Sequence, residues 1–436
     1  MPEFLKEGRP PGMQSDAAVE QRVRGMLAEI ERDGESAVRR FSRELDGWDP
    51  VSFALDPDQI AAATATVPAQ LRAQIDSAHH QVRTFAEAQL DCLRPLETTV
   101  GDGVVLGHRL VPVSSVGAYV PGGRYGLISS ALMSVATAKA AGVERVVVMS
   151  APRGDGGINA ATLYAAHVAG ADTVYALGGV QAMGAMAYGA LPGLEPVDMI
   201  VGAGNAYVAE AKRQLFGRVG IDLLAGPTEV LVIADETARP AVVAADLLAQ
   251  AEHGPTSPAV LITTSRELGV AVLDEIKPLL AAWSTGDVAG AAWAEHGVVA
   301  VVEDDNAAVA LADEYASEHL QLQVRDPRWW EERLRNYGTV FSGEETTVSF
   351  GDKGVGTNHT LPTNGAARYT GGLWVGTFVK VLTFQRLTRE ASARVAEMAA
   401  GISTAEGMVG HAASAELRGE LDRFERLPVG AGGGRS

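Results

Sequence analysis

The sequence predicts an α/β protein with two doubly wound lobes, a helical region before them and a helical tail after them. From His108 onward, short β-branched runs alternate with alanine-rich stretches of helical length. The expected strands are apolar at nearly every position, which is typical of parallel sheets covered by helices on both faces. The alternation runs through two successive rounds, and 436 residues suffice for two large domains. In such folds we expect ligands outside the carboxyl ends of the strands.

Residues 17–93 come before this alternation and are expected to be helical. Apolar residues recur there three and four positions apart, as at Val23, Met26, Leu27 and Ile30. The first round then gives strands at 110–120, 145–149, 173–177 and 199–202, with helices at 128–141, 159–169, 181–188 and 206–216.

The second round has the same pattern. Its strands are expected at 230–234, 259–263, 298–302 and 320–324, and its helices at 242–252, 267–280, 307–317 and 328–337. A polar, glycine-rich loop follows at 342–372. Loops of this length in a compact chain are usually functional or disordered, and the Asp, Asn, His and Thr residues in this one favour function. Helices are expected again from 385 to 426, before a glycine-rich end that we expect to be floppy.

The composition excludes several classes of protein. Apolar residues make up 47% and charged residues 21%, so a disordered or fibrous chain is excluded. The net charge of −18 would repel nucleic acids and anionic membranes. A single cysteine, Cys92, forms no internal disulfide and favours a reducing compartment. The first residues carry charges where a secretory signal is apolar, and glycines break the uncharged run at 173–194, so we expect a cytoplasmic protein.

Two glycine-containing turns are candidates for cofactor binding. The segment Gly202-Ala-Gly204-Asn205 follows a strand and precedes a helix, but it lacks the third glycine of the dinucleotide fingerprint. The segment from Tyr119 to Gly123 has the same setting, and its backbone N–H groups are suited to an anion. For either segment, an ordinary turn is the simpler interpretation.

A metal site is one interpretation of Gln250 and His253. They are three residues apart at the end of a predicted helix and therefore share one face. The alternative is that His253 simply complements the carboxyl end of the helix. Asp352 and His411 are available as further ligands, and mixed nitrogen and oxygen ligands suit catalytic zinc.

Glu318 and His319 form an adjacent acid and imidazole at the start of a predicted strand. Such a pair can act as general base and water activator in one crevice, although a solvated Glu beside a helix-terminal His is the simpler interpretation. Cys92 is the alternative nucleophile. It lies on a helical segment, and a free cysteine is more often a small apolar residue than a catalyst.

Taken together, these segments resemble the histidinol dehydrogenase family over nearly the whole chain. The stretches that carry the resemblance are Tyr119-Val-Pro-Gly-Gly, Gly178-Gly-Val-Gln181, Gly204-Asn205-Ala, Ala225-Gly-Pro-Thr228-Glu-Val, Gln250-Ala-Glu-His253-Gly, Glu318-His319-Leu, Gly356-Thr-Asn-His359 and Leu361-Pro-Thr. The resemblance implies a homodimer with incomplete Rossmann-like lobes, whose tail completes the partner's site. It also implies zinc and two successive NAD-dependent oxidations, from alcohol through aldehyde to carboxylate.

The resemblance assigns roles residue by residue. Its zinc ligands would be Gln250, His253, Asp352 and His411. His319 would take the hydroxyl proton and Glu318 would activate water. The substrate contacts would be Thr228, His359 and Glu406, and the NAD contacts would be Tyr119, Gln181 and Asn205. We expect an N-terminal arm at 1–25, a zinc and acid–base lobe at 26–118 and 229–372, an NAD lobe at 119–228 and a tail at 373–436.

Some segments depart from typical histidinol dehydrogenases. Lys353 follows Asp352 where an aromatic residue is usual, and the segment 368–374 also differs. With Pro121-Gly-Gly-Arg124-Tyr125, these segments look more like the sulfopropanediol 3-dehydrogenase branch, so we favour sulfopropanediol as substrate. If Lys353 points inward, it would attract the sulfonate, and Arg368 could add a forked contact to it. The alternative is that Lys353 faces solvent, as surface lysines usually do. Histidinol is the alternative substrate. A two-lobed ligand-binding protein without catalysis is the alternative of another class.

Overall fold

The computed structural model describes residues 2–9, 17–122, 126–153 and 157–419. The chain divides into two compact units. The larger comprises Met1–Cys92 with Pro112–Phe378, and the smaller comprises Leu93–Val111 with Val379–Ser436. None of the described helices is long and apolar enough to cross a membrane.

The larger unit contains a five-stranded parallel sheet that confirms the first predicted α/β round. Its strand order is β6-β5-β4-β7-β8, so the chain reverses direction across the sheet between β4 and β7. The strands are β4 (Ser115–Val120), β5 (Arg145–Ser150), β6 (Thr173–Ala176), β7 (Met199–Val201) and β8 (Gly220–Ile221). The helices between them are α5 (Ile128–Ala140), α6 (Ala160–Ala169), α7 (Gly179–Tyr188) and α8 (Ala206–Leu215). Doubly wound sheets commonly bind ligands outside the carboxyl ends of the two strands where the order reverses, which here are β4 and β7.

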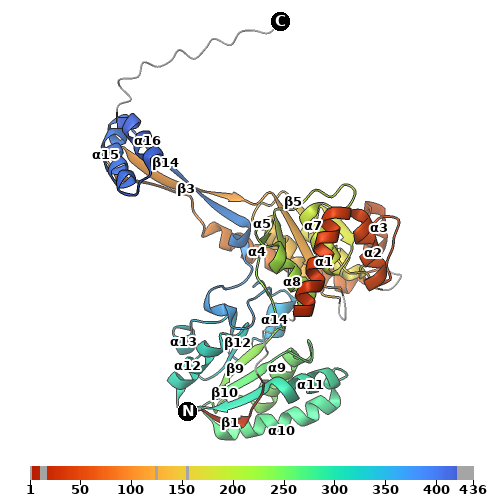
Figure 1. Ribbon diagram of the computed structural model, residues 1–436. Coiled ribbons are helices and arrows are strands. Elements are labelled where there is room, and N and C mark those ends of the chain that lie inside the picture. Colours follow the sequence, from red (N-terminus) through yellow and green to blue (C-terminus); the bar gives the residue numbers. More distant parts are fainter. Residues whose placement is uncertain (1, 10–16, 123–125, 154–156, 420–436) are drawn as a thin grey trace. The chain divides into compact units, whose positions relative to one another are not determined.

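The predicted N-terminal helices pack onto this first lobe. They are α1 (Ala17–Asp33), α2 (Glu35–Asp46), α3 (Pro57–Ala65) and α4 (Ala69–Asp91). Helix α1 lies against α7 and α8, and α4 lies against α5 and α6 (Figure 1). The buried face of α1, including Val23 and Ile30, shares one core with Met149 and Tyr175. The expected grouping of 26–118 with 229–372 therefore differs from the structure, because the apolar faces of these helices are buried on the first sheet.

A second sheet of six strands confirms the second round. Its order is β1-β11-β10-β9-β12-β13, and all pairs are parallel except β1 with β11. The strands are β1 (Glu3–Lys6), β9 (Val230–Ala234), β10 (Ala259–Thr263), β11 (Gly297–Val301), β12 (His319–Gln323) and β13 (Thr339–Ser342). The helices are α9 (Pro240–Ala251), α10 (Arg266–Ala282), α11 (Gly286–His296), α12 (Asp305–Tyr315), α13 (Pro327–Glu331) and α14 (Val348–Lys353). Alternate residues of β9 enter separate cores on the two faces, which explains its unbroken apolar sequence.

Several local predictions in this lobe were wrong. The edge strands β1 and β13 and the helix α11 were not expected, and the polar loop at 342–372 contains α14. The helix expected at 328–337 ends after Glu331. It ends there because the chain turns, and the backbone N–H groups of Arg335 and Asn336 donate to the carboxylate of Asp313.

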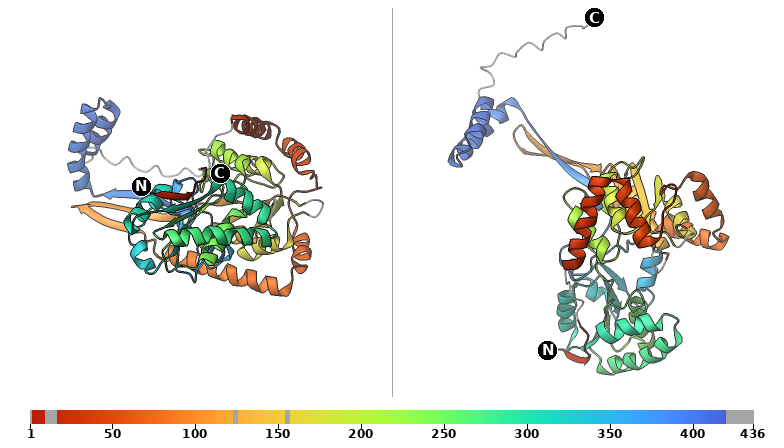
Figure 2. Two further views of the ribbon diagram at one scale, coloured as in Figure 1. Left: turned by 90° about the horizontal axis from the view of Figure 1, so that it is seen from below. Right: turned by 45° about the vertical axis from the view of Figure 1, so that its right-hand side comes forward.

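The smaller unit is a three-stranded sheet with two helices. Strand β3 (Val104–Pro112) lies between β2 (Leu96–Gly101) and β14 (Val379–Leu387). Helices α15 (Arg389–Ala405) and α16 (Val409–Gly419) pack against each other after β14 (Figures 1 and 2). The helix expected from 385 thus begins only after a strand. The single strand expected at 110–120 is two, β3 and β4, which belong to different units. The glycine-rich end lies outside the described residues.

Candidate active site

The candidate acid–base residues stand at the amino ends of two neighbouring strands. Glu318 directly precedes β12, whose first residue is His319, and Thr228 lies two residues before β9. The register pairs His319 with Val230, so the starts of both strands are side by side. The expected position at the carboxyl ends of the strands is therefore wrong for this lobe. The first lobe follows the expectation, because Gly202 and Ala203 follow the carboxyl end of β7.

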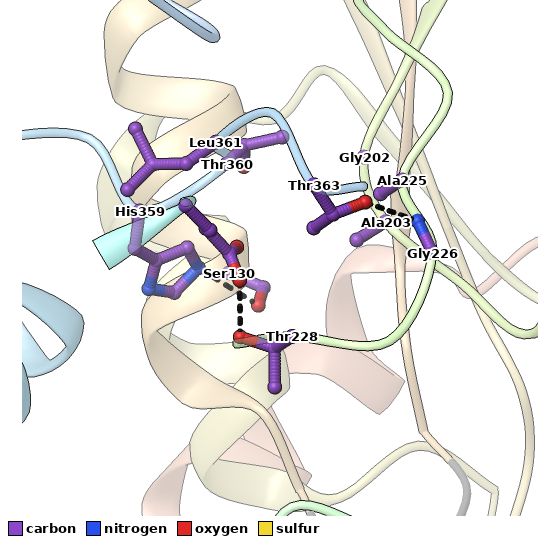
Figure 3. Close-up of a pocket in the computed structure, with 11 residues that line it drawn as sticks. Ser130, Gly202, Ala203, Ala225, Gly226, Thr228, His359, Thr360, Leu361 and Thr363 are labelled. Atoms are coloured by element: carbon purple, nitrogen blue, oxygen red, sulfur yellow. Dashed lines mark hydrogen bonds between the residues drawn. The ribbon is translucent and has the colours of Figure 1, made fainter. Parts of the chain in front are cut away.

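A pocket in the larger unit joins these strand ends. The first lobe contributes Ser130 of α5 and the turn after β7, and the second contributes the starts of β9 and β12 (Figure 3). The loop after His359 closes it. The full lining is Ser130, Gly202, Ala203, Ala225, Gly226, Thr228, Glu318, His359, Thr360, Leu361 and Thr363. The pocket thus contains the predicted substrate contacts Thr228 and His359 beside Glu318.

Glu318 is held by a chain of hydrogen bonds. The amide nitrogen of Gln250 donates to Thr228 Oγ1 over 2.5 Å, and that hydroxyl donates to Glu318 Oε2, also over 2.5 Å. The backbone N–H of Glu229 donates to the same oxygen over 2.9 Å. Burial raises the pKa of Glu318 to about 8, although both hydrogen bonds oppose the shift. Near neutral pH this carboxyl group can therefore give up or take up a proton.

His319 is a buried imidazole with one free nitrogen. Its Nδ1 is 2.9 Å from the backbone carbonyl of Glu229, which can only accept, so Nδ1 carries the proton. Its Nε2 is buried and has no hydrogen-bond partner among the described residues. Burial lowers the pKa of His319, so the ring is neutral and Nε2 has a free lone pair. This geometry suits a general base.

Glu229 was not singled out in the sequence. Its carboxylate accepts from the backbone N–H of Glu318 over 3.3 Å, and its carbonyl orients His319. Burial and the charge of Glu318 raise the pKa of Glu229 to about 8. The only feature of the sequence that could have pointed to Glu229 is its position directly before an apolar strand. A solvated surface residue is the simpler interpretation of an acidic residue there.

Asp352 lies among three imidazoles at the end of α14. Its carboxylate oxygens are 3.9 Å from His253 Nε2, 3.8 Å from His319 Nε2 and 3.9 Å from His359 Nδ1. His359 is oriented by the Asp352 carbonyl, to which Nδ1 donates, and by Ser130, whose hydroxyl donates to Nε2 over 3.2 Å. Burial lowers the pKa of His253 and of His359, so both rings are neutral. His253 is suited to a metal, whereas both nitrogens of His359 are already hydrogen-bonded.

The donor types of these residues fit a zinc ion. Ligand atoms about 2.0–2.1 Å from a tetrahedral ion lie roughly 3.4 Å apart, and the 3.9 Å between His253 Nε2 and Asp352 Oδ2 is longer, so the two side chains would have to move together around an ion. Gln250 is buried one turn before His253 on α9. The described residues hold no preformed group of three or more His, Cys, Asp or Glu ligands. A complete zinc site therefore needs a further ligand from another segment, and His411 is the predicted one.

The expected NAD contacts surround the carboxyl ends of the first sheet. Tyr119 lies near the end of β4, and its hydroxyl accepts from the backbone N–H of Gly179 over 3.2 Å. Gln181 is buried and donates to Asp46 over 2.7 Å. Asn205 is exposed and caps α8, where its side chain accepts from two backbone N–H groups. Gly202 has φ of 112°, and a side chain there would collide with the Tyr119 carbonyl. That contact explains this glycine.

Comparison with known proteins identifies the family. The sequence model described as histidinol dehydrogenase matches residues 10–419. The chain belongs to the histidinol dehydrogenase family. Members are NAD-dependent oxidoreductases that act on CH–OH donors, by four-electron oxidation of an alcohol to an acid.

Individual members are similar over nearly their full length. A histidinol dehydrogenase homolog of Shouchella clausii is 52% identical, over 96% of this chain and 99% of its own. Sulfopropanediol 3-dehydrogenase of Ruegeria pomeroyi is 46% identical, over 95% and 96%. The crystal structure of histidinol dehydrogenase from Elizabethkingia anophelis is 32% identical, with a TM-score of 0.89 over 96% of this chain and 95% of that one. The last comparison confirms the predicted fold class.

The remaining candidate residues of this histidinol dehydrogenase family member are more exposed. The ammonium group of Lys353 is 4.0 Å from Asp352, and 65% of its side chain is exposed. Arg368 is exposed and donates to the backbone carbonyls of Gly365 and Glu314, and its contact with a sulfonate stays a prediction. Glu406 ends α15 and His411 lies in the first turn of α16, both exposed in the smaller unit. Of the Pro121–Tyr125 segment, residues 123–125 lie outside the described residues.

Proposed function

We propose that this chain is a zinc- and NAD-dependent dehydrogenase that oxidises 2,3-dihydroxypropane-1-sulfonate (sulfopropanediol) to sulfolactate. The observation that supports it most is the neutral, buried His319 with an unpartnered Nε2, beside a carboxyl group of pKa about 8. A ligand-binding protein without catalysis has no use for this pair. The pair is suited to moving protons, which both oxidations require.

In the first oxidation, His319 Nε2 takes the proton of the substrate hydroxyl while a hydride leaves the same carbon for NAD. Tyr119, Gln181 and Asn205 are the proposed NAD contacts. Gln250, His253, Asp352 and His411 are the proposed zinc ligands, and zinc held there would supply Lewis acidity toward the hydroxyl oxygen. Thr228 and His359 orient the substrate from the pocket wall.

In the second oxidation, Glu318 takes a proton from water as the water oxygen bonds to the aldehyde carbon. A hydride then leaves that carbon for a second NAD. One alcohol, one water and two NAD⁺ thus give one carboxylate, two NADH and protons. The raised pKa of Glu318 supports this role, because a group with pKa near the working pH is an efficient proton acceptor.

The proposed substrate charge rests on two observations. Lys353 places a cation 4.0 Å from a proposed zinc ligand, where it would attract a sulfonate and repel a cationic amine. The relative named sulfopropanediol 3-dehydrogenase is 46% identical to this chain. Histidinol is the second candidate, favoured by Glu406, whose carboxylate would attract the amine, and by a relative from Synechococcus named histidinol dehydrogenase that is 42% identical.

A homodimer would complete the site, with Glu406 and His411 of one subunit entering the pocket of the other. Large apolar side chains exposed on α15, on α16 and in the turn between them support this arrangement, since such surface is usually covered by a partner. They are Met398, Ile402, Met408, Val409 and Leu417. The cytoplasm is the proposed location, because one exposed cysteine suits a reducing compartment.

An NADH absorbance assay with purified protein tests the proposal. Sulfopropanediol, histidinol and a plain uncharged diol should each be offered with NAD, and the NADH formed per alcohol consumed should be counted. We expect two NADH per sulfopropanediol and little turnover of histidinol. Efficient histidinol oxidation without sulfopropanediol turnover would establish the second candidate. Binding of an alcohol without NADH from any substrate would favour the ligand-binding class.

A further inference from the structure

The partly buried carboxylate of Asp246 lies one turn before Gln250 on α9 and joins the elements that carry the candidate site. Gln323 of β12 donates to Asp246 Oδ2 over 2.6 Å, and Gln321 donates to the same oxygen. Thr347 donates from its hydroxyl to Oδ1 over 3.0 Å. One side chain of α9 is thus bonded to β12 and to the residue directly before α14.

Each of these elements carries or leads into a candidate site residue. Asp246 and Gln250 lie one turn apart on the same face of α9, which ends at Ala251, two residues before His253. Strand β12 begins at His319, and α14 contains Asp352. Because Asp246 bonds all three, it restricts the distances among the imidazoles and the carboxylate.

The polar face of β12 is otherwise hard to explain. His319, Gln321 and Gln323 alternate along the strand and are all buried, while Leu320 and Leu322 enter the apolar core on the opposite face. Both glutamines direct their amide nitrogens at Asp246, and both amide oxygens are left buried without a hydrogen-bond partner among the described residues. Two orphaned acceptors are unfavourable in a strand that an aliphatic residue would fit.

Thr347 is a further side chain that bonds to Asp246 in place of a more usual partner. It occupies the N-cap position of α14 with an extended backbone, yet its hydroxyl makes no capping hydrogen bond. The usual role of a threonine there is to cap the helix. Instead the hydroxyl bonds to Asp246, so the start of α14 is fixed to α9.

We infer that Asp246 is a positioning residue that sets the geometry of the zinc ligands and of His319 by hydrogen bonding. The inference rests on the proposed function and extends it to a residue that touches neither substrate nor metal. Partners that hydrogen-bond metal ligands directly typically contribute about 10- to 100-fold in metal affinity or activity, and Asp246 acts less directly, through β12 and the start of α14. Asp246→Ala should therefore weaken zinc binding and lower kcat by about tenfold, the lower end of that range, with the KM for NAD unchanged.

Zinc affinity, measured by competition with a chromophoric chelator, is the primary readout. Kinetics and melting temperature are measured on the same proteins. Thr347→Val removes only the bond to α14 and should weaken zinc binding less than Asp246→Ala. Asp246→Asn should retain most of the zinc affinity. The oxygen of the new asparagine side chain can accept from Thr347, and its NH₂ group can donate to a glutamine oxygen of β12 that has no partner in the wild type. The matched control is Asp313→Ala, which removes a partly buried carboxylate of the same lobe that bonds only the turn after α13.

The control separates positioning from stability. Wild-type zinc affinity and kcat in Asp246→Ala, or an equal loss in Asp313→Ala, would overturn the inference. If Asp246→Ala does not fold, Thr347→Val decides, and unchanged zinc affinity in it would overturn the inference. A wild-type protein that binds no zinc would instead reject the zinc part of the proposed function. The positioning role would then be judged by kcat alone, with unchanged kcat in Asp246→Ala or Thr347→Val rejecting it.

Discussion

Replacing Glu318 by glutamine should change how the stability of the metal-free protein depends on pH. Glutamine has the same shape, and its amide oxygen can still accept from Thr228 and from the backbone N–H of Glu229. It has no proton to titrate. The comparison therefore isolates the ionisation of one fully buried carboxyl group whose pKa is raised by burial from 4.5 to about 8.

The sign follows from proton linkage. The folded protein holds the Glu318 proton more tightly than the unfolded chain does, so this proton stabilises the fold fully below about pH 4.5. The contribution is lost as the pH rises to about 8, because the buried group must then ionise. At 1.36 kcal/mol per pKa unit, wild type should lose about 3 kcal/mol relative to Glu318→Gln between about pH 5.5 and about pH 9. Glu229 acts in the same direction, since its pKa is raised by burial and also by the Glu318 charge, which the substitution removes.

Calorimetry of chelator-treated protein is the assay. With an unfolding entropy of about 2.1 cal/mol/K per residue, 1 kcal/mol moves the melting temperature of a unit of about 360 residues by roughly 1.3 °C, so the gap between the two proteins should widen by about 4 °C over that pH range. Chelation is needed because a nearby cation would lower the carboxyl pKa. If the difference in melting temperature between the two proteins stays constant across this pH range, Glu318 does not have a raised pKa in the folded protein.

Three further outcomes are expected. His319→Asn should lower kcat by about 10²- to 10⁴-fold, with NAD affinity by fluorescence titration nearly unchanged; a wild-type rate would reject the general base, and Cys92→Ser is the silent control. His253→Ala should lose zinc in elemental analysis, and chelator-treated wild type should regain NADH production on adding Zn²⁺; full activity of metal-free protein would contradict this. Lys353→Ala should raise the KM for sulfopropanediol about tenfold in steady-state kinetics, with the KM for NAD unchanged; an unchanged diol KM would place this ammonium away from the substrate.

Local sequence was sufficient for most of the fold. Strands such as Val230–Ala234 and helices such as Ile128–Ala140 follow directly from runs of apolar residues, because each element must bury its own side chains. Predictions failed where another segment decided the outcome. Strand β1 exists because it pairs with β11, almost three hundred residues away in sequence. Strand β14 likewise depends on lying beside β3. Neither pairing can be read from neighbouring residues.

The sequence by itself determined the family and the identities of the candidate site residues, because short segments such as Glu318-His319 and Gln250-Ala-Glu-His253 resemble known ones. It also determined the two α/β rounds, because hydrophobic periodicity is a local property. Only the tertiary structure decided which nitrogen of His319 is free, since that depends on the Glu229 carbonyl. It likewise decided that Glu318 holds its proton to about pH 8 and that Asp246 joins three elements. Burial and hydrogen bonding depend on residues distant in the chain, so they exist only once the chain has folded.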